Sequence, residues 1–148
     1  MQLRKVLDTK QKQKPPEVAV NINLQKTREM VETPDDRRNR IYNYIDIELD
    51  LFGIRAKLKG RQYLREAIYV QIHSTKDRGS GIEEVAAKFN YTYASIIKTM
   101  QTAIDNAWDS GDPKEILQHF TARITAKSGV PYVSDFIHFY AEKIKKSI

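Results

Sequence analysis

The sequence contains no cysteine. This absence excludes disulfide bridges, thiol catalysis and the cysteine-based zinc-finger routes to DNA, and it suits a reducing compartment. Long apolar runs are missing as well, since no segment approaches the roughly 20 apolar residues that a membrane span needs. The opening stretch MQLRKVLDTKQKQK also lacks the apolar centre of a signal peptide. We therefore expect a cytoplasmic protein without membrane contact.

Motifs of catalysis and ligand binding are also missing. The sequence has no glycine-rich phosphate loop, no nucleophile elbow and no Ser-His-Asp order. Its three histidines, His73, His119 and His138, lack metal-ligand spacing relative to each other and to any carboxylate pair. We therefore expect no enzyme, no catalytic residue, no metal, no cofactor and no small-molecule ligand.

The composition that is present describes a globular protein. Of the 148 residues, 41% are hydrophobic and 30% are charged, which indicates one domain with a genuine core and a modest extension. The formal net charge is +6, and a positive protein attracts an extended polyanion such as nucleic acid. Any DNA binding must then come from helices and basic side chains.

Residues 1–36 are predicted to form an N-terminal basic arm, because they are rich in Lys, Gln, Pro, Glu and Asp and contain no aromatic residue. Within the arm, Val18–Leu24 alternates apolar and polar residues, which predicts a short β-strand. A lone strand is unstable in water. Two interpretations stay open: a flexible tail with a transient extended piece, or a strand that docks on a partner or forms a dimerising ribbon. Gln25–Glu32 is predicted to add a short helix that ends before Pro34.

Residues 37–148 are predicted to form an all-α domain of about six helices that contains a helix-turn-helix. The helical pattern begins at Asp36 and stops at Gly53, with one apolar face formed by Ile41, Ile45, Leu49 and Phe52. The other expected helices are Gly60–His73, Ile82–Phe89, Tyr93–Trp108, a helix from Pro113 that carries Ile116, Leu117 and Phe120, and a last one from Val133 that buries Ile137, Tyr140 and Ile144.

Charged residues within these helices receive structural interpretations. Asp46, Glu48 and Asp50 are read as a solvated acidic face, while Arg65 and Glu66 are predicted to form structural ion pairs.

The stretch VAAKFNYTYASIIKTMQTAIDNAW, residues 85–108, has the features of a helix-turn-helix. Such a motif needs a small residue where its helices touch and a residue that tolerates a left-handed backbone at the turn. Ala86 is the small residue, and Asn90 occupies the turn because asparagine is the usual substitute for glycine there. Thr92 is predicted to cap the following helix.

The long helix that follows the turn has two contrasting stripes. Its apolar stripe is predicted to face the core and consists of Ile96, Met100, Ala103, Ile104 and Ala107. The opposite stripe is predicted to read DNA bases, since lysine can donate to guanine, glutamine can pair with adenine, and small or apolar side chains can meet the thymine methyl. The predicted base-reading residues are Ala94, Ser95, Ile97, Lys98, Gln101 and Thr102.

Phosphate contacts are predicted from basic side chains and from hydroxyls near the turn. The predicted set is Lys57, Lys59, Arg61, Lys88, Tyr91, Thr92, Tyr93, Arg123 and Lys127. Engaging about five phosphates predicts that log affinity falls against log salt with a slope of about −4 to −5.

Several segments together resemble the DNA-binding effector domain of the sporulation master response regulator of endospore-forming bacteria. The resemblance covers roughly residues 39–148. It is carried by Ile54–Gly60, by Tyr63–Ile68 (YLREAI), by Ala87–Asn90 with Thr92, by Ala103–Ile104 with Ala107–Trp108 and Gly111, and by Phe120 and Pro131 with Ser134–Ile137. It implies a six-helix transcription regulator that places its 93–108 helix in the major groove of double-stranded DNA, with copies in tandem on repeated sites.

The sequence departs from that family in three respects. The base-reading side of the family's helix is rich in Arg and Glu, whereas here it carries Ser95, Ile97, Lys98 and Gln101, so we expect a different DNA sequence. The connection from Gln71 to Gly81 is shorter and more polar. We expect the arm to stand where the family carries a phosphoacceptor receiver domain, so phosphorylation-driven dimerisation cannot simply be carried over from the resemblance.

Two alternatives stay open beside the transcription regulator. One is a plasmid or phage accessory protein that binds repeated DNA sites for replication, transfer or partition. The other is a protein-interaction adaptor with this fold that has lost DNA binding.

Overall fold

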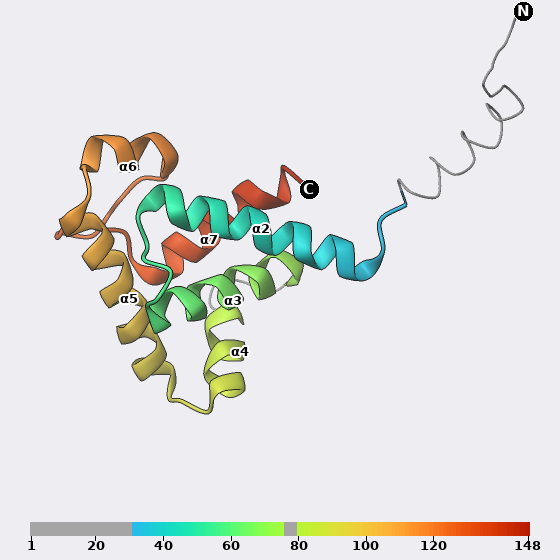
Figure 1. Cartoon of the computed structure of the whole chain (residues 1–148). Coiled ribbons are helices and arrows are strands. Elements are labelled where there is room, and N and C mark those ends of the chain that lie inside the picture. Colours follow the sequence, from blue (N-terminus) through green and yellow to red (C-terminus); the bar gives the residue numbers. More distant parts are fainter. Residues whose placement is uncertain (1–30, 76–79) are drawn as a thin grey trace, which may run out of the picture. The chain divides into compact units, whose positions relative to one another are not determined.

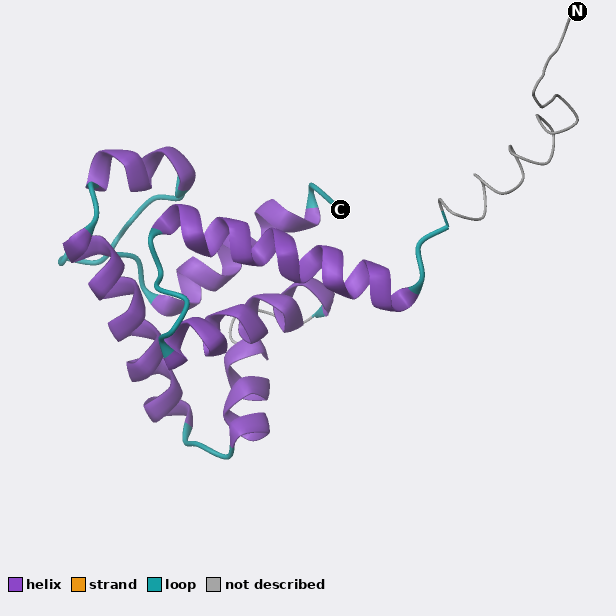
Figure 2. Cartoon of the chain, in the orientation of Figure 1, coloured by secondary structure: helices purple, strands orange, loops and turns teal. Residues whose placement is uncertain are grey.

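The computed structural model describes residues 31–75 and 80–148, and residues 39–148 form one compact unit. Within the described ranges the secondary structure consists of six α-helices, with no strand (Figures 1 and 2). The predicted all-α class and number of helices are confirmed. The predicted strand Val18–Leu24 and nearly all of the predicted helix Gln25–Glu32 lie outside the described residues, and the boundary after residue 36 stays a prediction.

The first described helix, α2, spans Pro34–Phe52 and begins slightly before the predicted start. The reason lies in its cap, where the backbone N–H of Asp36 donates to the Thr33 hydroxyl at 3.0 Å and the Asp36 carboxylate accepts from the Thr33 N–H at 3.3 Å. This reciprocal pair satisfies amides that no helical carbonyl can reach. Pro34 therefore opens α2, because the first helical position needs no N–H. The predicted apolar face of α2 is buried.

The remaining helices lie close to their predicted ranges. They are α3 (Lys59–His73), α4 (Ser80–Phe89), α5 (Tyr93–Ser110), α6 (Pro113–His119) and α7 (Val133–Lys145). Helix α3 packs against α4, α5 and α7, and a short turn joins α4 to α5 (Figure 1). Among the helices of the described ranges, none combines the length and the apolarity needed to cross a bilayer.

An aromatic cluster joins the end of α2 to α6 and α7. The Phe52 ring meets Phe136 edge-on at a centroid distance of 4.9 Å and Phe120 at 6.1 Å, and such edge-to-face pairs add to the gain from area burial alone. Ile116 is buried beside this cluster, but Leu117 is 44% exposed. Only part of the apolar set on α6 therefore faces the core.

The acidic face of α2 is not simply solvated, which corrects the sequence interpretation. Asp46 accepts a hydrogen bond from Arg65 Nε at 2.9 Å, and Glu48 pairs with Lys143 Nζ at 3.0 Å. Helices α3 and α7 bring these cations to α2 from distant parts of the chain, which no spacing within α2 could reveal. The predicted structural ion pairs of Arg65 and Glu66 are confirmed, the latter with Lys88.

Candidate nucleic-acid interface

The corner between α4 and α5 has the predicted local chemistry. Asn90 adopts a left-handed backbone with φ of 59°, and it is the one non-glycine residue with positive φ in residues 31–75 and 80–148. The side-chain oxygen of Thr92 accepts from the backbone N–H of Ser95 at 3.1 Å, which caps the start of α5. The chain therefore reverses within a few residues, and α5 begins with a satisfied amide.

Helix α4 lies unusually close to α3 because a glycine stands at the contact. A Cβ atom on Gly81 would lie only 2.3 Å from the backbone oxygen of Ala67. Val85 and Ala86 are also buried on this side of α4. Because the small residues allow this approach, α3 serves as the platform that holds the helix-turn-helix corner.

A second close approach places α5 beside the start of α3. A Cβ atom on Gly60 would lie 2.6 Å from the Thr99 carbonyl oxygen and 2.7 Å from the Ala103 Cβ. Above this contact lies a groove of about 250 Å³. Its polar lining comes from Lys59, Lys98, Thr99, Thr102 and Asn106. The groove therefore brings together two of the predicted DNA-contacting lysines, one from each helix.

The two stripes of α5 differ in burial. All residues of the predicted apolar stripe are buried, from Ile96 to Ala107. Of the predicted base-reading residues, Ala94, Ser95, Lys98 and Thr102 are exposed. Ile97 is half-buried and packs against the hydrophobic core. The exposed part of the stripe is thus polar or small, as a groove-reading helix requires.

Gln101 differs from the other predicted base readers because its amide is already engaged. Its Nε2 donates to the carbonyl of Pro131 at 3.0 Å and to the carboxylate of Asp105 at 3.1 Å. Its Oε1 accepts from the backbone N–H of Val133 at 3.1 Å. Pairing with adenine would require Gln101 to give up these partners, so the geometry speaks against the predicted role.

Arg61 also departs from its predicted role as a phosphate contact. Its side chain points inward, and the residue is 7% exposed. One guanidinium nitrogen donates to the Asp50 carboxylate and to the Ile54 carbonyl, both at 2.6 Å, and the other donates to the Asp46 carbonyl at 3.2 Å. Arg61 therefore ties the loop before α3 to α2. Lys57 and Lys59, which flank the same region, are exposed.

Lys88 on α4 is exposed but not free. Its Nζ lies 2.9 Å from the Glu66 carboxylate, which also accepts a hydrogen bond from the Tyr42 hydroxyl. Burial alone would raise the pKa of Glu66, but the hydrogen bonds from Tyr42 and Lys88 and the charges of Lys88 and Arg65 outweigh it, so the pKa of the carboxyl is lowered. The ion pair holds Lys88 near the corner.

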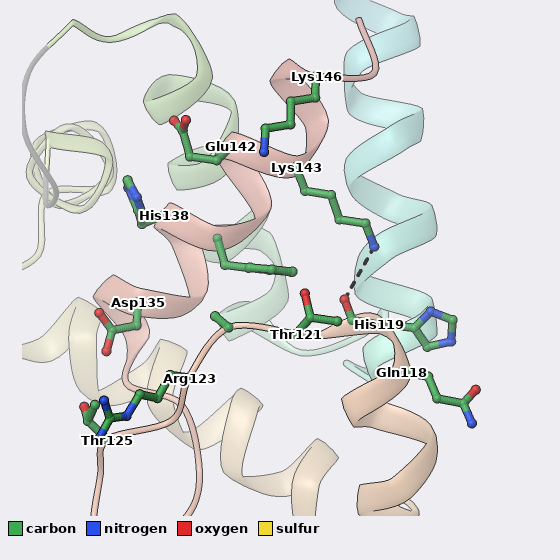
Figure 3. Close-up of a pocket in the computed structure, with 12 residues that line it drawn as sticks. Gln118, His119, Thr121, Arg123, Thr125, Asp135, His138, Glu142, Lys143 and Lys146 are labelled. Atoms are coloured by element: carbon green, nitrogen blue, oxygen red, sulfur yellow. Dashed lines mark hydrogen bonds between the residues drawn. The ribbon is translucent and has the colours of Figure 1, made fainter.

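The other predicted phosphate contacts are placed in two different regions. Tyr91 and Tyr93 are 50% and 45% exposed at the corner, on either side of Thr92. Arg123 instead lines an open pocket of about 890 Å³ between residues 118–125 and α7 (Figure 3). This pocket shares no lining residue with the groove between α3 and α5. Lys127 is exposed in the connection that follows.

Two polar residues that line the groove, Thr99 and Asn106, were not among the predicted contacts. Asn106 continues the stripe of Lys98 and Thr102 at intervals of four, so following that helical spacing further would have found it. Thr99 was harder to find, because its place is set by the close approach of Gly60.

A buried stripe that fixes α5, a capped left-handed corner and a lysine-lined groove define a helix-turn-helix DNA-binding domain. The sequence comparison agrees, since the family described as "Sporulation initiation factor Spo0A C terminal" matches residues 45–144. The match spans more than half of the chain, and the chain therefore belongs to this family, whose members are DNA-binding transcriptional effector domains. The resemblance predicted from the sequence is confirmed, and the family is not one of enzymes.

Proposed function

We propose that the protein is a transcriptional regulator that inserts the N-terminal part of α5 into the major groove of duplex DNA. The observation that carries this proposal is the lysine-lined groove between α3 and α5, which runs along the flank of α5 beside its buried stripe. An α-helix fits the major groove of B-DNA, and base edges there offer distinct patterns of donors and acceptors. The positive end of the α5 dipole at the corner favours phosphates on either side.

The proposed contacts divide by chemistry. Ala94, Ser95, Lys98 and Thr102 are the proposed base readers, because they are exposed on one stripe of α5. We do not propose this role for Gln101, whose amide is engaged, and Ile97 contributes at most its exposed edge to a thymine methyl. The proposed phosphate contacts are Lys57, Lys59, Lys88, Lys127, Arg123, and the residues of the corner, Tyr91, Thr92 and Tyr93.

The salt dependence of binding measures how many of these contacts form. Engaging about five phosphates gives a slope of log affinity against log salt of about −4 to −5. Each phosphate contact contributes about 0.9 to this slope. Losing one contact therefore lowers affinity by about eightfold at 0.1 M salt, because fewer counterions are released on binding. Removing a single lysine at the interface is therefore measurable by a conventional gel shift or fluorescence titration.

The test uses the full chain with a pool of random duplexes, from which bound sequences are selected. We expect one motif to be enriched. Lys98→Ala should lower affinity by about 1–3 kcal/mol, which is roughly five- to 150-fold, and relax the preference at a single base position. Lys114→Ala is the matched control, since it removes the same charge from an exposed position on α6 outside the groove.

Two results would contradict the proposal. One is binding that selects no motif; the other is an equal loss in Lys98→Ala and Lys114→Ala, which would indicate only nonspecific charge attraction. Absence of DNA binding would favour the adaptor alternative. Tandem binding is a separate proposal, tested by whether duplexes with repeated motifs take up more than one protein chain.

A further inference from the structure

Gln101 bridges α5 to a distant part of the chain. Its acceptor oxygen serves the N–H of Val133, the first residue of α7, and its donor nitrogen serves the carbonyl of Pro131. The N-cap residue of α7, Tyr132, provides no side-chain cap of its own. Gln101 therefore supplies, from another helix, the acceptor that a local cap would ordinarily supply.

Only a primary amide of the right length can make this bridge. A backbone N–H needs an acceptor and a carbonyl needs a donor, and glutamine offers both groups on one side chain. The two partners also determine which end of the amide is oxygen. Glutamate would keep the acceptor but lose the donor, and an apolar side chain of similar size would lose both.

The bridge anchors one end of the connection between α6 and α7. The other end is anchored by Phe120, which is 1% exposed in the aromatic core. Lys127 lies between the two anchors and is exposed, shortly before Pro131. Its distance from the reading stripe of α5 is thus set by how the connection is held against α5.

We infer that Gln101 is a positioning residue for DNA binding: it holds the 121–132 connection against α5 so that Lys127 can contact a phosphate while α5 occupies the major groove. This inference rests on the proposed function. Helix α5 then has two roles on neighbouring stripes. Lys98 faces the groove, and Gln101 holds the 121–132 connection, which carries the second DNA contact.

The experiment is a double-mutant cycle with Gln101→Met, Lys127→Ala and the combined variant, titrated with the selected duplex at several salt concentrations. Each single variant should reduce the salt slope by about 0.9 and lower affinity by about eightfold at 0.1 M salt. The combined variant should show the same eightfold loss, because Gln101 acts through Lys127. Independent residues would instead give a loss of about sixtyfold.

Two further measurements separate positioning from a structural role. The Val133 amide should exchange its hydrogen faster in Gln101→Met than in the wild type, because its acceptor is gone. Base preference should be unchanged in Gln101→Met. Gln101→Asn keeps the amide but is too short for both partners, so it should behave like the methionine variant. If Gln101→Met does not fold, Gln101→Asn takes its place in the double-mutant cycle.

The outcomes are separable. If Gln101→Met lowers only the unfolding midpoint and leaves the salt slope of the folded protein unchanged, the inference is wrong. A changed preference at one base would overturn it too and restore a reading role for Gln101. If the wild type selects no DNA motif, the proposed function itself fails, whereas wild-type selection with additive effects in the cycle removes the positioning inference alone.

Discussion

Gly60 offers the sharpest test of how α5 is held. In Gly60→Ala, the new Cβ would lie 2.6 Å from the Thr99 carbonyl oxygen and 2.7 Å from the Ala103 Cβ. Favourable carbon contacts lie at about 3.5–4.0 Å, so α3 and α5 must separate by up to about 1 Å. The nearest atom belongs to the backbone of α5, so a rotamer change cannot relieve the clash.

The cost follows from this overlap. Overpacking of this kind destabilises proteins by about 1–3 kcal/mol, and the gain in helix propensity from Gly to Ala offsets at most about 1 kcal/mol. We therefore expect Gly60→Ala to lose about 1–2 kcal/mol in the free energy of unfolding, which lowers Tm by roughly 4–10 °C. Lys59 and Lys98 line the groove over this contact, so DNA affinity should fall as their spacing widens.

The assay combines thermal unfolding by circular dichroism with DNA titration at a temperature where both proteins are folded. Ile144→Val is the control, because the loss of one buried methyl group on α7 costs about 0.5–1.5 kcal/mol without changing the groove. Ile144→Val should lower Tm by an amount that overlaps the loss in Gly60→Ala but keep wild-type DNA affinity. An unchanged or raised Tm in Gly60→Ala would refute the close contact of α3 and α5 and the placement of the groove.

Three further predictions concern the corner and its supports. Asn90→Ala should lower the free energy of unfolding by about 1–2 kcal/mol, because alanine disfavours a left-handed backbone, whereas Asn90→Gly should be about as stable as the wild type. Equal losses of stability in urea unfolding would contradict the left-handed conformation of residue 90. Thr92→Ala should lower the free energy of unfolding by about 1 kcal/mol, because the helix cap is lost. An unchanged midpoint of urea unfolding would contradict the hydrogen bond from the Ser95 N–H to the Thr92 side chain. Because the folded pKa of Glu66 is below its ordinary value of 4.5, its stabilisation is present above that pH and is lost as pH falls through the folded pKa. The difference in the free energy of unfolding between the wild type and Glu66→Gln should then become smaller as the pH is lowered. A difference that grows at low pH, measured by urea unfolding, would exclude the stabilising role of the ionised Glu66 carboxylate.

Much of the fold could be predicted because local signals and burial agree. The apolar stripe of α5, from Ile96 to Ala107, recurs at helical spacing and is buried. Asn90 and Thr92 have short-range roles that depend only on a few neighbouring residues, so their chemistry is visible in the sequence. Leu117 shows the limit of this reasoning, since an apolar residue on a short helix need not face the core.

The candidate site was less predictable, because its residues meet across long sequence separations. Arg61 is basic and sits near predicted contact residues, but its partners Asp46 and Asp50 belong to another helix. Composition cannot distinguish a lysine or arginine that faces solvent from one that neutralises a carboxylate inside the protein. The same limit applies to the acids of α2, which the sequence alone presents as a solvated face.

The sequence by itself determined the helical class, the capped corner and the two-sided character of α5, because these follow from spacing and from the backbone preferences of single residues. The tertiary structure decided which polar side chains remain available. Gln101 and Lys98 lie on the same helix. The Gln101 amide hydrogen-bonds to the backbone of Pro131 and Val133, whereas Lys98 remains exposed. Tertiary packing decides which distant segments supply hydrogen-bond partners, and helical periodicity in the sequence does not reveal them.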